Sequence, residues 1–151
     1  MKRFFAILCA FIILVSMPGT VCATEVIQAE EIEYFEDGSY LVTTVIQSAA
    51  RATNTTSGRI QQTMVDASGN TDWQISLSGT FTYNGTSAVC TASSIDVAIY
   101  DTAYYTVSKT AGKSGASATG SATIGQTFLG ITFAKNTYDL TLTCDPNGTL
   151  S

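Results

Sequence analysis

Three tyrosines that lie close together in the sequence, Tyr100, Tyr104 and Tyr105, are the residues of this 151-residue chain best suited to recognise a partner. A tyrosine ring can stack on the face of a sugar or anchor a protein interface, because it joins a large apolar surface to a hydroxyl group. Neighbouring residues of a strand point to opposite faces, so at least one of Tyr104 and Tyr105 should face outward. We therefore expect a glycan or an extracellular protein as partner, with aromatic packing at the end of the domain as the alternative role.

Few residues of this chain are of the types that enzymes use for catalysis. It contains no histidine, which removes the Ser-His-Asp and Cys-His triads, the usual zinc sites and the commonest general base. Carboxylates could form the acid pair of a glycoside hydrolase, and Asp66 with Asp72 and Asp96 with Asp101 are close in sequence. Aspartates that form turns or protect a sheet edge explain both pairs more simply. We predict a non-enzymatic protein with no catalytic residue, no metal site and no cofactor.

The first 23 residues have the pattern of a secretory signal peptide. Lys2 and Arg3 form the positive start, residues 4–15 form an unbroken apolar run, and Val21 and Ala23 precede the expected cleavage site. The apolar run is shorter than the roughly 20 residues that span a membrane. We predict a secreted protein with no stable membrane insertion after cleavage, and an uncleaved anchor is the alternative.

Removal of residues 1–23 changes the charge of the protein. Both basic residues of the segment leave with it, so five Lys and Arg residues remain against all 12 acids, a net charge of −7. A chain this acidic is repelled by nucleic acids and by anionic membrane surfaces. We expect no nucleic-acid partner.

The cysteine count changes in the same step. Cys9 and Cys22 fall in the signal peptide, which leaves Cys90 and Cys144 in the exported chain. Two cysteines in an oxidising compartment most simply form a disulfide bond, and two reduced thiols are the alternative. Cys22 could instead carry a lipid, although the bulky Val21 before it does not fit that signal.

The remaining chain divides into an acidic segment, residues 24–38, and a single domain, residues 39–151. Five of the segment's six acids lie close together, Glu30, Glu31, Glu33, Glu36 and Asp37, which predicts a solvated, mobile N-terminus; a docking tail or a weak calcium-attracting patch is the alternative. In the domain, apolar residues alternate with polar ones at the period of half-buried strands. The clearest runs cover residues 40–46, 73–83, 95–99, 116–124, 129–133 and 138–144.

Turn-forming pairs separate these runs at the spacing of β-hairpins. They are Asp37-Gly38, Ser57-Gly58, Ser68-Gly69-Asn70, Asn84-Gly85, residues 112–115, Lys135-Asn136 and Asn147-Gly148. Seven to nine short strands at this spacing predict an all-β fold, an antiparallel β-sandwich that is immunoglobulin-like in architecture.

Several blocks of the sequence resemble a group of small secreted bacterial proteins that is frequent in Gram-positive gut bacteria. The blocks are residues 39–44, 51–58, 68–70, 79–88 and 141–145. These relatives are β-rich domains of unknown function, so the resemblance implies bacterial export and a paired Cys90 and Cys144 and supplies no catalytic residue. The leading hypothesis is a secreted binding module; a self-assembling extracellular subunit is the second and a carboxylate-dependent hydrolase the third.

Overall fold

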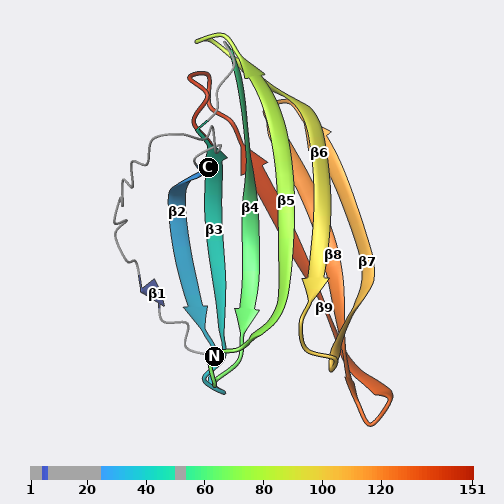
Figure 1. Cartoon of the computed structure of the whole chain (residues 1–151). Helices are drawn as coiled ribbons and strands as arrows, with labels where there is room; N and C mark the ends of the chain where they lie inside the picture. The colour runs from blue at the N-terminus through green and yellow to red at the C-terminus, as the bar shows by residue number, and fades with distance from the viewer. Residues whose placement is uncertain (1–4, 7–24, 50–53) are drawn as a thin grey trace, which may run out of the picture.

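The computed structural model describes residues 5–6, 25–49 and 54–151, and this part of the chain is all-β (Figure 1). Its nine strands are β1 (Phe5–Ala6), β2 (Glu25–Tyr34), β3 (Tyr40–Ser48), β4 (Thr55–Val65), β5 (Thr71–Tyr83), β6 (Ala88–Ile99), β7 (Tyr104–Ser114), β8 (Ser117–Phe128) and β9 (Ile131–Thr143). The predicted signal peptide falls outside these residues except for β1, so it stays a prediction.

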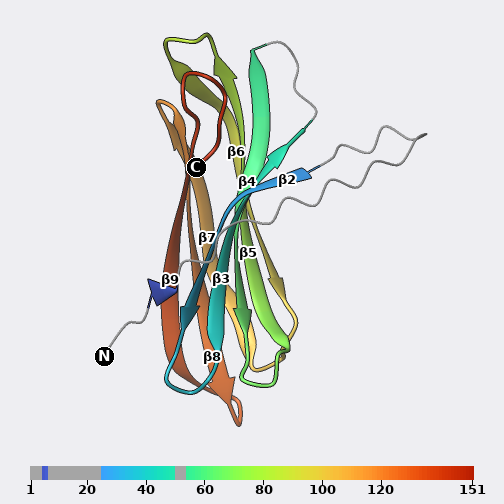
Figure 2. The ribbon, with the colours of Figure 1, turned by 90° about the vertical axis from the view of Figure 1, so that its left-hand side faces the viewer.

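Two antiparallel sheets make up the fold. Strands β1 to β6 form a six-stranded sheet and β7 to β9 a three-stranded sheet, and within each sheet every strand pairs with the next one in the chain. The two sheets lie face to face as two layers, which Figure 2 shows from the side. The prediction of an antiparallel, sandwich-like all-β fold is confirmed at this level.

The core lies between the layers and follows the alternation of the sequence. In β5, the side chains of Trp73, Ile75, Leu77 and Phe81 are at most 1% exposed. They meet a facing sheet whose inward residues are mostly small or aliphatic, namely Ala118, Gly120, Ala122, Ile124, Leu140 and Leu142. A Cβ atom at Gly120 would lie 2.9 Å from Leu77, so the small residues of β8 let the two sheets approach closely.

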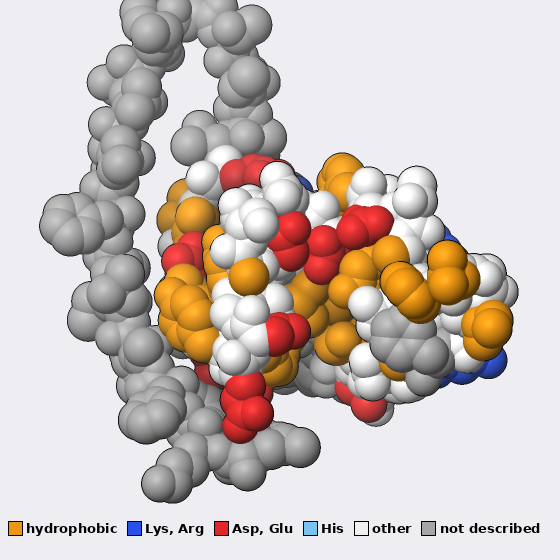
Figure 3. Space-filling view, turned by 90° about the horizontal axis from the view of Figure 1, so that it is seen from below, with side chains coloured by type: hydrophobic (Ala, Val, Ile, Leu, Met, Phe, Trp, Pro, Cys, Tyr) orange, Lys and Arg blue, Asp and Glu red, His pale blue; other side chains and the backbone are white. Residues whose placement is uncertain are grey.

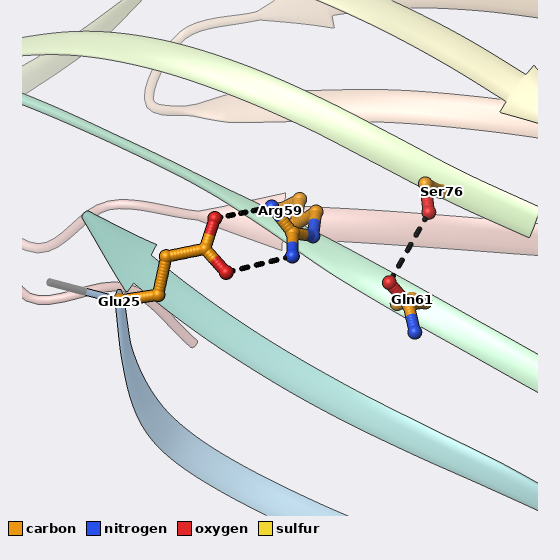
Figure 4. Close-up of polar contacts among 4 residues, drawn as sticks. All are labelled: Glu25, Arg59, Gln61 and Ser76. Atoms are coloured by element: carbon orange, nitrogen blue, oxygen red, sulfur yellow. Dashed lines mark hydrogen bonds and ion pairs between the residues drawn. The ribbon is translucent and has the colours of Figure 1, made fainter. Parts of the chain in front are cut away.

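The acidic segment is a strand, which corrects the expectation of a mobile N-terminus. Residues 25–34 form β2, which pairs with β3 along its length, although almost all of its side chains are exposed. A bulge between Ile27 and Ala29 shifts the register and so breaks the alternation that a sequence search detects. Glu25 joins β2 to β4 through two contacts with Arg59, of 2.6 and 2.8 Å (Figure 4).

Glycine-containing turns close most of the hairpins where the sequence predicts them. Gly38, Gly69, Gly85 and Gly148 all have positive φ, which glycine adopts without steric cost. Two of the predicted turns are wrong, because Ser57-Gly58 lies inside β4 and Lys135-Asn136 lies inside β9. A third, predicted at residues 112–115, is displaced to residues 115–116, since residues 112–114 belong to β7. Gly58 serves a close approach instead, since a Cβ atom there would lie 2.4 Å from Leu150.

The β8–β9 turn was not anticipated. The predicted strand over residues 129–133 begins only at Ile131, because Leu129 and Gly130 form a two-residue turn between the paired Phe128 and Ile131. A leucine rarely adopts positive φ, so nothing in the residue types marks this turn except the glycine.

Candidate functional site

Four turns gather at one end of the molecule, which we call the lower end. They are residues 35–39 between β2 and β3, 66–70 between β4 and β5, 100–103 between β6 and β7, and 129–130 between β8 and β9. The β8–β9 hairpin extends farther than the other turns, as Figures 1 and 2 show at the bottom of each view. The three predicted recognition tyrosines all lie at or near this end.

The alternation predicted for Tyr104 and Tyr105 is present. Tyr104 turns inward, packs against the core and accepts a hydrogen bond from the Gln126 side chain at 3.1 Å. Tyr105 turns outward and lies across Gly125, where a Cβ atom would be 2.4 Å from its ring. Its hydroxyl is 2.9 Å from the Thr132 hydroxyl. Both rings therefore have structural partners inside the chain.

Tyr100 behaves differently from the other two tyrosines. Its side chain is 61% exposed, while its backbone N–H donates to the carbonyl oxygen of Asp72 at 2.9 Å. The ring is thus held out from a fixed backbone position. Of the three tyrosines predicted for binding, Tyr100 is the one whose position suits contact with a partner, and the three do not form one surface.

A buried carboxylate lies beside Tyr104. Asp72 is 6% exposed and bonds to the Tyr104 hydroxyl. Burial and the nearby charge of Asp101 raise the pKa of Asp72. Burial and Asp72 in turn raise the pKa of Tyr104 to about 12. Neither ion pair found in the described part of the chain involves Asp72, so no lysine or arginine there forms a salt bridge with it.

The other carboxylates considered for hydrolysis have structural roles. Asp66 accepts backbone N–H bonds from Ser68 and Asn70, both at 2.8 Å, and Asp101 accepts one from Ala103 at 2.8 Å. These are the local bonds by which aspartate fixes a turn. Asp96 forms an exposed ion pair of 3.2 Å with Lys109 on the neighbouring β7. The geometry thus favours the turn and edge roles over an acid pair for catalysis.

The sequence reasoning missed the most exposed part of the lower end. Phe128, Leu129 and Ile131 at the β8–β9 turn are 69%, 86% and 71% exposed. Tyr34 and Phe35 at the β2–β3 turn are 57% and 39% exposed. Figure 3, which views the molecule from below, shows apolar and acidic side chains next to each other on this end. A usable signal was the uncharged stretch 123–134, which carries Phe-Leu-Gly-Ile at its centre.

A second feature is a shallow, open depression of about 340 Å³ on the outer face of the three-stranded sheet. Its walls are mostly hydroxyl-bearing and include one carboxylate: Thr110, Thr119, Ser121, Asp139 and Thr141. Gly112 leaves the depression unfilled because it has no side chain, whereas a Cβ atom at Gly120 would point into the core towards Leu77. The depression has polar groups but no aromatic ring among its lining residues, so it lacks the stacking platform of a typical sugar site.

The two cysteines lie together at the opposite end, which we call the upper end. The backbone N–H groups of Cys90 and Cys144 donate to the carbonyl oxygens of Gly115 and Ala116, at 2.8 and 3.0 Å. Both side chains are buried, and burial raises the pKa of the Cys90 thiol, which opposes a role as nucleophile. The disulfide stays a prediction, and the structure brings its two residues to neighbouring positions.

No protein-family model, curated protein or solved structure matches this chain. Among the described residues, no helix is long and apolar enough to cross a membrane. The same residues contain no group of three or more Cys, Asp or Glu side chains arranged to hold a metal ion.

Proposed function

We propose that this protein is a secreted, non-enzymatic binding module that contacts a partner outside the cell through its lower end. One observation carries the proposal: the exposed aromatic and aliphatic residues of three separate turns, Tyr34 and Phe35, Tyr100, and Phe128 to Ile131, lie at the same end. An exposed apolar group of this kind is unfavourable in water unless a partner covers it.

The architecture supports this role. Turns on a rigid two-layered framework are free to carry recognition residues, because most of the buried core lies on the strands. The immunoglobulin-like description, which rests on the number and spacing of the strands, stays part of this proposal; in such domains the loops at one end of the sandwich make the contacts. The Asp66 and Asp101 side chains add order to the turns, so the exposed rings start from defined backbone positions.

Export is supported by the signal-peptide pattern and by the arrangement of the cysteines. Cleavage after Ala23 would remove β1 and leave β2 at the edge of the sheet. Cys90 and Cys144 then lie on opposite layers next to the same β7–β8 turn, a placement in which a disulfide would join the two sheets.

The test compares lower-end and upper-end substitutions of similar exposure. We would purify wild-type residues 24–151, Tyr100→Ser, Phe35→Ser and, as control, Val89→Ser, whose upper-end side chain is 51% exposed. Each protein would be probed on a glycan array and against a surface-protein extract from cells that make this chain. We expect Tyr100→Ser or Phe35→Ser to weaken binding about tenfold and Val89→Ser to leave it unchanged.

The proposal fails if wild type binds neither probe, or if Val89→Ser reduces binding as much as the lower-end variants. Tyr104→Ala is unsuitable here, because it would remove a side chain that packs against the core and bonds to Asp72. A loss of binding in that variant would report a damaged fold.

Self-assembly through sheet edges is the second candidate function. The exposed Val26 and Ile27 on β2 favour it. The bulge in β2 and its four glutamates oppose it, since both features discourage edge pairing. Sedimentation would show concentration-dependent oligomers if assembly is the function, and a single monomeric species under the proposed one.

A further inference from the structure

We propose that the tip of the β8–β9 hairpin is a wedge that enters an apolar pocket on a partner protein, and that this pocket has a basic rim. By tip we mean Phe128, Leu129, Gly130 and Ile131. The inference rests on the proposed binding function and names the residues that insert and the chemistry of the surface that receives them.

The tip is both protruding and apolar. Phe128 and Ile131 pair across the hairpin and are joined by a turn of only two residues, so three large side chains crowd one point. They are the three most exposed large apolar residues in the described part of the chain, at 69%, 86% and 71%. No charged residue occurs between positions 123 and 134, so nothing on the hairpin's own end opposes its burial by a partner.

Leucine is unfavourable in the backbone conformation that position 129 adopts. Its φ of 51° and that of Gly130, 78°, are both positive, as a type I′ hairpin turn requires. Asparagine followed by glycine is the favoured pair for this turn, whereas a leucine meets steric conflict in the left-handed region. At this position the sequence carries a residue that opposes both turn stability and solubility, and local conflicts of this kind cluster at functional sites.

The charge of the lower end favours a protein pocket over an anionic membrane. The four lower-end turns carry Glu36, Asp37, Asp66 and Asp101 and no Lys or Arg. Anionic lipids would be repelled by these charges, and a basic rim around an apolar pocket would complement them. Phe128 is the one ring of the tip on which a sugar could stack, whereas the more exposed Leu129 and Ile131 are aliphatic and fill pockets, so the tip as a whole suits an apolar pocket better.

Leu129→Asn is the decisive variant, because it should improve the fold while it destroys the wedge. Asparagine tolerates positive φ, so we expect the thermal midpoint to rise by a few degrees. Leu129→Met keeps an apolar tip and is the matched control, with Val89→Ser as the control for an exposed apolar residue at the upper end.

The three variants and wild type would be immobilised and exposed to the surface-protein extract, and the retained protein would be purified and its affinity measured. We expect Leu129→Asn to bind it about tenfold more weakly or worse, and Leu129→Met and Val89→Ser to match wild type. Wild-type affinity should fall as salt is raised, because the basic rim acts through charge.

Four results would overturn the proposal that the tip inserts into a pocket on a partner protein. Retention of the same protein by Leu129→Asn at wild-type strength would do so, and if Tyr100→Ser abolished that retention the proposed binding function would still stand. Leu129-dependent binding to phosphatidylcholine vesicles, with or without phosphatidylserine, would identify a lipid surface instead. Leu129-dependent binding on the glycan array would identify a sugar. Dimers that form in wild type and dissociate in Leu129→Asn would identify a second copy of this chain as the partner.

Discussion

The two ends of this molecule differ in how far their large apolar side chains are exposed to solvent. At the upper end, the chain returns after β9 and pairs Cys144 with Leu150, and the Leu150 side chain is 2% exposed. Below it, Gln47 is 1% exposed and donates to the carbonyl oxygen of Gly148 at 2.6 Å. The C-terminal residues thus close the upper end of the core.

The lower end has no such cover. Leu129 is 86% exposed there, and the carboxylate of Asp72 is buried without a cation. The contrast is one of degree, because the upper end has an exposed Val89 and a buried Gln47 Oε1 with no hydrogen-bond partner, while the lower end has a larger number of exposed apolar side chains. Proteins lose stability at sites where function requires strained or exposed groups, so the contrast indicates which end to test for binding.

The largest effect should come from the cysteines of the upper end. A disulfide between Cys90 and Cys144 would close a loop of about 54 residues, for which chain entropy gives up to about 4 kcal/mol. Protein exported to an oxidising compartment should therefore lose several degrees of thermal midpoint when reduced, and the double variant Cys90→Ala/Cys144→Ala should be insensitive to reductant. Mass spectrometry of the non-reduced peptides measures the bond directly. Two alkylatable thiols in the exported protein would contradict the prediction.

A matched pair of leucines tests the contrast between the ends. Leu150→Ala removes a side chain that fills the space over Gly58 and should reduce the free energy of unfolding by about 3 kcal/mol. Leu129→Ala removes the same atoms from an exposed tip and should change it by no more than about 0.5 kcal/mol. Urea unfolding of the two variants gives the comparison. Equal losses would mean that the lower end is also part of the stabilising core.

The sequence predicted the sheet-forming runs well, because their alternation comes from one buried face. Trp73 to Tyr83 was found in this way, and so was the inward direction of Cys144. Prediction from the sequence fails where a strand or glycine is explained by a residue elsewhere in the chain. The side chains of β2 do not alternate between a buried and an exposed face, and β2 forms because the edge of β3 is free to pair with it. Gly58 is predicted as a turn residue, but its missing side chain makes room for Leu150.

The candidate binding residues were harder to predict for a related reason. Tyrosine type and spacing led to the lower end, which is the end proposed for binding, but exposure decides which rings are free to contact a partner. Tyr104 is held by Asp72 and the core, a contact between residues 32 positions apart that no local pattern contains. Leu129 was assigned to a strand, because a run of apolar residues gives no sign that a leucine has entered a turn with positive φ.

The smallest expected effect concerns the buried carboxylate of Asp72 at the lower end. The folded-state pKa of Asp72 is raised by burial and by Asp101, so folding favours its protonated form. The ionised group therefore destabilises the fold at neutral pH, and this penalty disappears as pH falls through the folded-state pKa towards the unfolded value of about 3.9. Asp72→Asn keeps an acceptor for Tyr104 and removes the charge. It should be more stable than wild type at neutral pH, by a margin that shrinks as pH falls.

Asp66→Asn provides the control with the opposite sign. Hydrogen bonds from Asn70 lower the pKa of Asp66, so its ionised form stabilises the fold above the unfolded value, and that contribution is lost as pH falls through the folded-state pKa. Asp66→Asn should therefore be less stable than wild type at neutral pH. Unfolding curves for both variants between pH 3 and pH 7 separate the two aspartates. If Asp72→Asn were the less stable protein at neutral pH, the buried carboxylate would support the fold as Asp66 does, and the lower end would not retain an unfavourable charge.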